Sequence, residues 1–258
     1  MSSVKSKPKL KKYYIKKSIN RKLCLEANLK GFLCSCNNRE KDCIRESYNL
    51  LNQYADKLYP SSSTQDYQTE DVDDLLNKEI SELKEESKTN RRFQVIESGA
   101  KNFLFIRTTL DNPVELAETI VKDIHQTGNQ KTRFLLRLIP VEITCKAYIT
   151  DITKAFEQIV DMHFKEKAQT FSVMFNHRNN DTLSRDEIIK LMAEKVFKTR
   201  TDHKVDLKTA DVSIIVEIIR GYAFLSVVPN YLRYKKYNLL SICDNEQTKD
   251  EALQTDYT

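Results

Sequence analysis

A short polar group ends an apolar run in the second half of the chain. The stretch TFSVMFNHRNNDTLSRDEIIKLM, residues 170–192, alternates like a buried strand, becomes basic and amide-rich, and then shows a helix start. Arg178 and Asn179 would lie where the free N–H groups and the positive dipole end of that helix favour a phosphate. With His177 they could form a catalytic centre, a binding edge or only a polar turn, and Asn180 also suits an Asx-type turn.

Other basic residues could extend such a site. Arg133 and Arg137 stand four apart in TRFLLRLIPV, a predicted strand, so they would share one face. Lys146 follows that strand and would point to a cleft between two domains. Near the end, NYLRYKKYNL interleaves tyrosines with Lys235 and Lys236, and we expect tyrosines to pack on the domain while the lysines contact phosphates. Each of these cations could also be only solvated surface.

Local signatures of catalysis are absent from the sequence. Its four glycines stand far apart, so neither a Gly-x-Gly-x-x-Gly nor a Walker A loop can be written. The nucleophile elbow and His-Glu-x-x-His are missing, and the six cysteines lack the paired spacing of zinc sites. Glu217, inside a strand, is interpreted as an outward-facing or paired carboxylate rather than a general base. We therefore expect no cofactor and no metal, although an active site assembled from distant residues stays open.

Charge is unevenly distributed along the 258 residues. The chain is 40% hydrophobic and 31% charged, which suits a soluble protein with a core, and no apolar run approaches the roughly 20 residues of a membrane span. No secretory signal is seen, so an intracellular setting is expected. Residues 1–22 carry nine Lys or Arg and no acid, whereas residues 66–88 hold nine acids against three lysines. The basic arm, with two tyrosines, favours contact with nucleic acid or nuclear import over an inert tail.

The order of predicted elements indicates an α+β protein with two units. The first unit has the element order of a ferredoxin-like fold. It consists of a strand in KGFLCSC, a helix over 39–58, an insert at 61–90, two strands, a helix capped by Asn112 and a strand stopped by Pro140. That unit is a sheet with two helices on one face. A second unit follows: a helix, the strand at 170–176, a helix with a Ser184 capping box, and two strands joined by a hairpin at Arg220 and Gly221.

Several long stretches resemble one known family. Five stretches, in this order, are similar to the THUMP-domain adaptor proteins of tRNA acetylation. They are GFLCSCNNREKDCIRESYNLLNQYADKLYP, RRFQVIESGAKNFLFIRT, KTRFLLRLIPVEITCKAYITDI, TFSVMFNHRNNDTLSRDEII and KVDLKTADVSIIVEIIRGYAFLSVVPNYLRYKKYNL. The resemblance spans roughly residues 30 to 240. It implies a ferredoxin-like domain over 30–143 and a THUMP domain over 144–242, between a disordered basic arm (1–29) and an acidic tail (243–258).

The resemblance also implies a function. Family members bind tRNA and work with a separate RNA cytidine acetyltransferase, which forms N4-acetylcytidine in the D arm of serine and leucine tRNAs. By that analogy the chain is a non-catalytic adaptor in the nucleus or nucleolus, and also in the cytoplasm, with no cofactor, no membrane contact and no small-molecule substrate of its own. A catalytic domain would have no room after residue 240. The alternative is a general RNA-binding or protein-interaction module. The predicted RNA-binding residues are Arg133, Arg137, Lys146, Arg178, Asn179, Lys235 and Lys236.

Overall fold

The computed structural model describes residues 24–59 and 91–243. Most of the basic arm, the acidic insert at 61–90 and the acidic tail from residue 244 lie outside the described residues. The last residues of the arm have fixed partners, because Asn28 donates its N–H to the Thr144 carbonyl at 2.7 Å and Leu29 donates to the Thr144 hydroxyl at 2.9 Å. In the described ranges no helix combines the length and the apolar character that a bilayer span requires.

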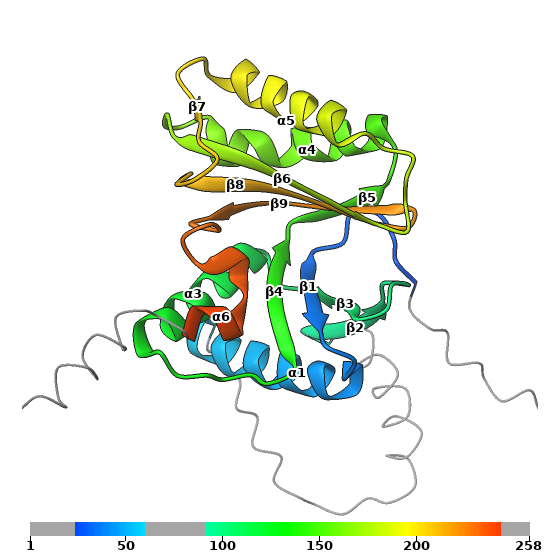
Figure 1. Ribbon diagram of the computed structural model, residues 1–258, viewed down its shortest axis with the longest axis vertical. Helices are drawn as coiled ribbons and strands as arrows, with labels where there is room; N and C mark the ends of the chain where they lie inside the picture. Colours follow the sequence, from blue (N-terminus) through cyan, green and yellow to red (C-terminus); the bar gives the residue numbers. More distant parts are fainter. Residues whose placement is uncertain (1–23, 60–90, 244–258) are drawn as a thin grey trace, which may run out of the picture.

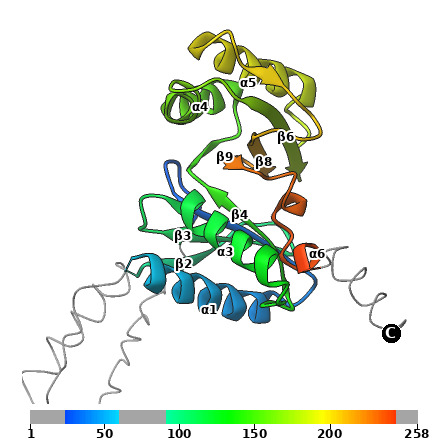
Figure 2. The same cartoon turned by 90° about the vertical axis from the view of Figure 1, so that its left-hand side faces the viewer.

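The first unit has the predicted ferredoxin-like topology. Its strands are β1 (Gly31–Cys36), β2 (Phe93–Glu97), β3 (Phe103–Thr108) and β4 (Leu135–Val141), paired antiparallel in the order β2-β3-β1-β4. Helices α1 (Glu40–Leu58) and α3 (Pro113–Thr127) lie on one face of this sheet (Figure 2). The α+β class predicted from the sequence is therefore confirmed.

Local chemistry sets the ends of α3. The Asn112 side chain accepts a hydrogen bond from the Glu115 N–H at 3.1 Å, and Pro113 occupies the first turn, where no N–H is needed. Gly128 ends the helix with a φ of 64°, which costs glycine little. This helix starts as the sequence predicted.

Pro140 does not stop its strand, contrary to the prediction. β4 continues through Pro140 to Val141 because it is the edge strand next to β1, where Pro140 lies opposite Phe32. Proline lacks the N–H of a ladder bond, and an edge strand can turn that position away from its single neighbour. Neither sheet order nor edge position can be read from the local sequence.

The second unit contains β5 (Ile143–Lys146), α4 (Ile149–Phe164), β6 (Thr170–Arg178), α5 (Arg185–Thr199), β7 (Lys204–Val205), β8 (Val212–Ile219) and β9 (Tyr222–Pro229). The sheet order is β5-β9-β8-β6-β7, with β6 parallel to β7 and β8. The hairpin at Arg220 and Gly221 is confirmed, because Ile219 pairs with Tyr222. Ser184 precedes α5 as predicted, but its side chain makes no capping hydrogen bond.

The two sheets pack on each other through the faces that their own helices leave uncovered, so that α4 and α5 lie at one end of the molecule and α1 at the other (Figure 1). Ile215, Ile219 and Phe224 of the second sheet belong to the core of the first unit, and the rings of Phe224 and Phe105 lie 5.3 Å apart. After β9 the chain returns to the first unit through a turn, η1 (Lys235–Tyr237), and α6 (Leu239–Cys243).

Candidate nucleic-acid interface

Two arginines lie at the junction of the sheets. Arg137 on β4 and Phe103 on β3 are both in register with Ser35 on the central strand, so all three side chains share one face. The Arg178 guanidinium, at the end of β6, lies 3.9 Å from the centroid of the Phe103 ring. This cation–π contact holds one face of the guanidinium and leaves its N–H edges available.

Further basic residues complete a concave surface at this junction. A cavity of about 160 Å³ is lined by polar and basic side chains, among them Arg137, Asn176, Arg185 and Lys236. A shallower concavity beside it is lined by Asn176, Arg178 and Arg185. We call this surface the basic cleft and define it by Arg137, Asn176, Arg178, Arg185 and Lys236. Within the described ranges none of its four cations forms an ion pair with a carboxylate.

An unusual turn supplies the cleft lysine. Lys235, Lys236 and Tyr237 have φ values of 50°, 58° and 54°, three successive non-glycine residues in the left-handed region. Tyr231 and Tyr234 are buried together with Tyr237, which confirms that tyrosines of this segment pack on the domain. Lys236 reaches the cleft, whereas Lys235, although exposed, lines neither concavity.

Glu217 lies buried behind the cleft. It is only 3% exposed, so of the two predicted alternatives, an outward-facing or a paired carboxylate, the first was wrong. Asn176 donates to Glu217 Oε1 at 2.6 Å, and Oε2 has no hydrogen-bond partner among the described residues. Burial raises the pKa of Glu217, while the Asn176 hydrogen bond and the charges of Arg178 and Arg137 act against this shift. The Glu217 carboxyl group therefore fixes the orientation of the Asn176 amide.

The asparagines after β6 have different places. Asn180 forms the predicted Asx-type turn, since its Oδ1 accepts from the Thr182 N–H at 3.1 Å, and its Nδ2 donates to the Arg220 carbonyl at 2.6 Å. Asn179 is exposed with a φ of 53°, and it lines neither concavity. The helix residue that does reach the cleft is Arg185, the first residue of α5.

Arg133 does not lie on the strand, contrary to the prediction. β4 begins at Leu135, and Glu46 holds the segment before it by accepting the Arg133 N–H at 3.0 Å. The guanidinium of Arg133 lies 5.4 Å from the centroid of the neighbouring Phe134 ring, and Arg39 lies over the same ring. Arg133 therefore belongs to a separate basic and aromatic group.

Lys146 is also apart from the cleft. It ends β5, where it pairs with Tyr222 of β9. Tyr222 pairs with Ile219 of β8, and Ile219 pairs with Arg178 of β6. Three strand spacings separate Lys146 from Arg178, about 14 Å, on the same face of the sheet. Of the seven predicted residues, the structure thus brings Arg137, Arg178 and Lys236 together. It adds Asn176 and Arg185, which the sequence analysis did not single out.

One signal could have indicated Arg185. The first turn of a helix favours acidic residues because of the helix dipole, and α5 has Asp186 and Glu187 there. An arginine at the first position is less favourable for the helix and therefore suggests another role. Among the described residues, no group of three or more His, Cys, Asp or Glu could hold a metal ion.

The fold and the cleft define an α+β protein whose second unit is a recognised domain. Residues 146–228 match the family model described as "THUMP domain". The chain is 38% identical to "THUMP domain-containing protein 1 homolog" of Drosophila melanogaster, over 97% of this chain and 84% of that protein. It is 38% identical to "THUMP domain-containing protein 1" of Bos taurus, over 84% of this chain but only 64% of that longer protein. A more distant relative, 25% identical over 88% of this chain and 89% of its own length, is "tRNA acetyltransferase TAN1" of Saccharomyces cerevisiae.

These likenesses cover most of the chain and include both units. The chain belongs to the THUMP domain-containing protein 1 family.

Proposed function

We propose that this chain binds tRNA through the basic cleft and presents it to a separate RNA cytidine acetyltransferase. The product is N4-acetylcytidine in the D arm of serine and leucine tRNAs. The observation that carries the RNA-binding part is the convergence of four cations, from β4, β6, α5 and η1, on one concave surface, where none of them forms an ion pair with a carboxylate among the described residues. The tRNA part is supported by the name of the yeast relative.

The chemistry of the cleft suits phosphate groups and exposed bases. Arginine forks bind phosphate oxygens with two parallel hydrogen bonds, and Lys236 adds a compact positive charge. Asn176 offers an amide that can contact a base edge or a ribose hydroxyl. A surface of this kind would hold a folded RNA by its backbone and release counterions on binding, so its affinity should fall as salt is added.

Two features favour an adaptor over an enzyme. The whole sequence has four glycines and no close pair of them, so no Gly-rich loop is available to hold ATP or acetyl-CoA. Glu217 has the raised pKa of a possible general base, but its free Oε2 atom is not accessible to solvent and could not reach a substrate. The name of the yeast relative, an acetyltransferase, favours the second candidate: catalysis by this chain itself.

Reconstitution separates the two candidates. Purified chain, acetyl-CoA, ATP and serine tRNA are incubated with and without the RNA cytidine acetyltransferase, and N4-acetylcytidine is measured by mass spectrometry of nucleosides. The adaptor proposal expects product only when both proteins are present, and less product when Arg178 and Arg185 are replaced by glutamine. Product from this chain alone would refute the division of labour.

A further inference from the structure

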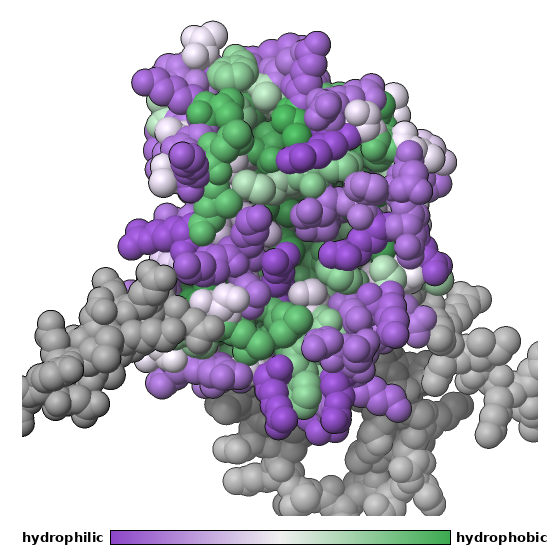
Figure 3. Space-filling model, in the orientation of Figure 1, coloured by the Kyte–Doolittle hydropathy of each residue, from purple (hydrophilic) through white to green (hydrophobic). Residues whose placement is uncertain are grey.

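Exposed apolar side chains gather at the outer edge of the second sheet. Phe197 at the end of α5 is 38% exposed, Val205 on β7 is 54% exposed and Leu207 just after it is 71% exposed. Val205 is in register with Phe171, whose ring lies 5.6 Å from that of Phe197, so these side chains meet on the helix-covered face of the sheet. The space-filling view shows apolar surface on the side of the molecule where β7 lies (Figure 3). We call Phe197, Val205 and Leu207 the β7 surface.

The backbone beside these side chains is an open strand edge. β7 is the last strand in the sheet order. Lys204 donates its N–H to the Gln169 carbonyl at 3.3 Å, and Asp206 donates to the Phe171 carbonyl at 2.9 Å. Because backbone groups alternate in direction along a strand, the N–H and C=O groups of Val205, between these two inward-facing residues, face away from the sheet. An added strand could pair there.

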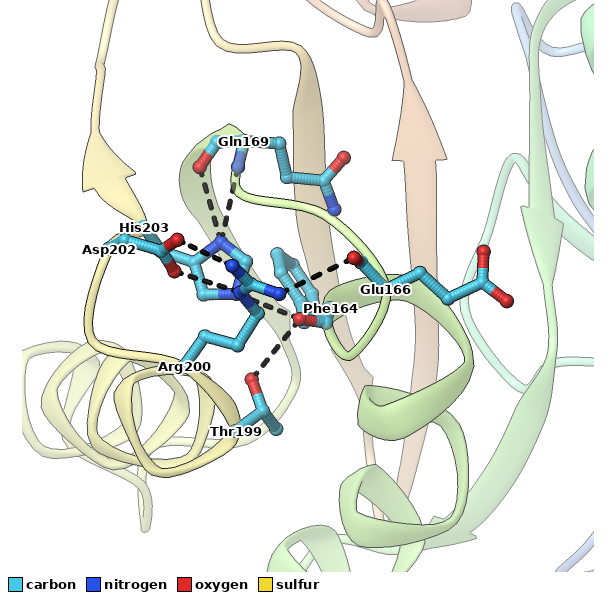
Figure 4. Close-up of polar contacts among 7 residues, drawn as sticks. All are labelled: Phe164, Glu166, Gln169, Thr199, Arg200, Asp202 and His203. Atoms are coloured by element: carbon cyan, nitrogen blue, oxygen red, sulfur yellow. Dashed lines mark hydrogen bonds and ion pairs between the residues drawn. The ribbon is translucent and has the colours of Figure 1, made fainter.

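The connection that leads into β7 is held in place from the α4 side (Figure 4). His203 is 4% exposed, and its Nε2 lies 2.9 Å from the Phe164 carbonyl. Arg200 donates two hydrogen bonds to the Asp202 carboxylate, at 2.9 and 2.6 Å, and one to the Glu166 carbonyl at 3.4 Å. These contacts fix the edge before any partner arrives.

The residues after β7 are fixed as well. The Asp206 carboxylate accepts hydrogen bonds from the Thr209 hydroxyl at 2.6 Å, from the Thr209 N–H at 2.9 Å and from the Lys208 N–H at 2.7 Å, and these bonds lower the pKa of Asp206. Leu207 therefore stands in an ordered turn, although it is largely exposed. A surface that is already ordered loses little conformational freedom on binding.

The border of the β7 surface is positively charged. Lys204 and Lys208 flank this surface and form no ion pair with any carboxylate in the described ranges, and Arg200 is neutralised by Asp202. One carboxylate, that of Asp206, lies between Val205 and Leu207, so the two lysines leave a net positive charge. Charge complementarity therefore favours an occupant that combines acidic residues with apolar ones. A strand edge and the aliphatic side chains of Val205 and Leu207 suit a protein segment, whereas Phe197 offers a single aromatic ring on which a base could stack.

We propose that an extended acidic and apolar segment of the acetyltransferase partner binds the β7 surface and adds a strand to β7. This inference rests on the proposed function and deepens it by assigning the partner's docking site. Arg178 in the basic cleft lies seven residue steps along β6 from Phe171, which lies beside β7, a distance of about 23 Å along the strand. The two surfaces therefore lie at separate places on the second sheet.

The test replaces one exposed side chain. Leu207→Asp is compared with Tyr148→Asp, which removes a similarly exposed side chain (64%) at the opposite end of α4 and introduces the same charge. Affinity for the purified acetyltransferase and for tRNA is measured by biolayer interferometry, and thermal unfolding checks the fold. We expect Leu207→Asp to weaken binding of the acetyltransferase about tenfold or more, as for a central apolar contact. Its tRNA affinity, and both affinities of Tyr148→Asp, should match those of the wild type. Leu207→Gln gives the same comparison without a new charge.

Four results would count against the proposals in different ways. Equal enzyme binding by Leu207→Asp and wild type would overturn the docking site and leave the adaptor function intact. Absence of enzyme binding by the wild-type chain would overturn the adaptor function itself. A loss of tRNA affinity in Leu207→Asp would assign the surface to RNA. A wild-type dimer that the variant abolishes would assign it to a second copy of the chain.

Discussion

The salt dependence of tRNA binding tests the basic cleft most directly. Each phosphate contact contributes about 0.7 to 0.9 to the slope of log affinity against log salt. The four cations of the cleft would contribute about 3 to this slope, and replacing Arg185 and Lys236 by glutamine should lower it by about 1.4 to 1.8. Between about 50 and 200 mM salt, the contribution of the cleft to the loss of affinity would fall from roughly 50- to 150-fold to roughly 7- to 12-fold.

The assay is fluorescence anisotropy with labelled serine tRNA over a series of salt concentrations. The nine cations of residues 1–22 act equally in all variants, so the difference in slope is the informative quantity. A matched control is the double variant Lys122→Gln and Lys190→Gln, which removes two lysines that each pair with a glutamate on the same helix. A slope unchanged in the cleft variant, or lowered equally in the control, would refute the assignment of the cleft.

Three further outcomes are expected. Because burial raises the pKa of Glu217, its ionisation at neutral pH opposes folding, and this free-energy cost disappears as the pH falls below the usual glutamate range. Glu217→Gln should therefore raise the melting temperature at pH 7 but not near pH 4, and scanning fluorimetry would measure both values. Phe224→Ala removes a ring that is 1% exposed and packs on Phe105, so urea unfolding should show a loss of about 3–5 kcal/mol, and a loss below about 1 kcal/mol would contradict a shared core. Burial raises the pKa of both Cys34 and Cys145 to about 12, so a thiol reagent at pH 8 should label these two only after denaturation.

Local chemistry made parts of the fold predictable. The cap at Asn112 and the hairpin at Arg220 and Gly221 depend on residues close in sequence, and both are present. The order of strands and helices in the first unit followed from periodicity in the same way, whereas the short strands β5 and β7 of the second unit were not predicted. Pro140 shows the limit of this reasoning, since its effect depends on whether β4 lies inside the sheet or at its edge, which is set by distant strands.

The site was less predictable because its residues come from separate segments. Arg137, Arg178 and Lys236 could be named as single basic residues, but only the packing of the sheets brings them together. Glu217 stands in VSIIVEII, a strand buried on both faces, so alternation could not show which way it points. Arg133 was misplaced because the predicted strand begins at Thr132 and β4 begins at Leu135, a three-residue error that is enough to move a side chain off the sheet.

The left-handed turn at Lys235–Tyr237 sets stability against recognition. An L-residue in this conformation costs about 1–2 kcal/mol, a penalty that glycine escapes. Lys236→Gly would therefore relax the backbone while removing a cation of the cleft. We expect this variant to have a higher melting temperature and a lower affinity for RNA. Engineering guided by thermostability alone would select against the very lysine that the turn displays.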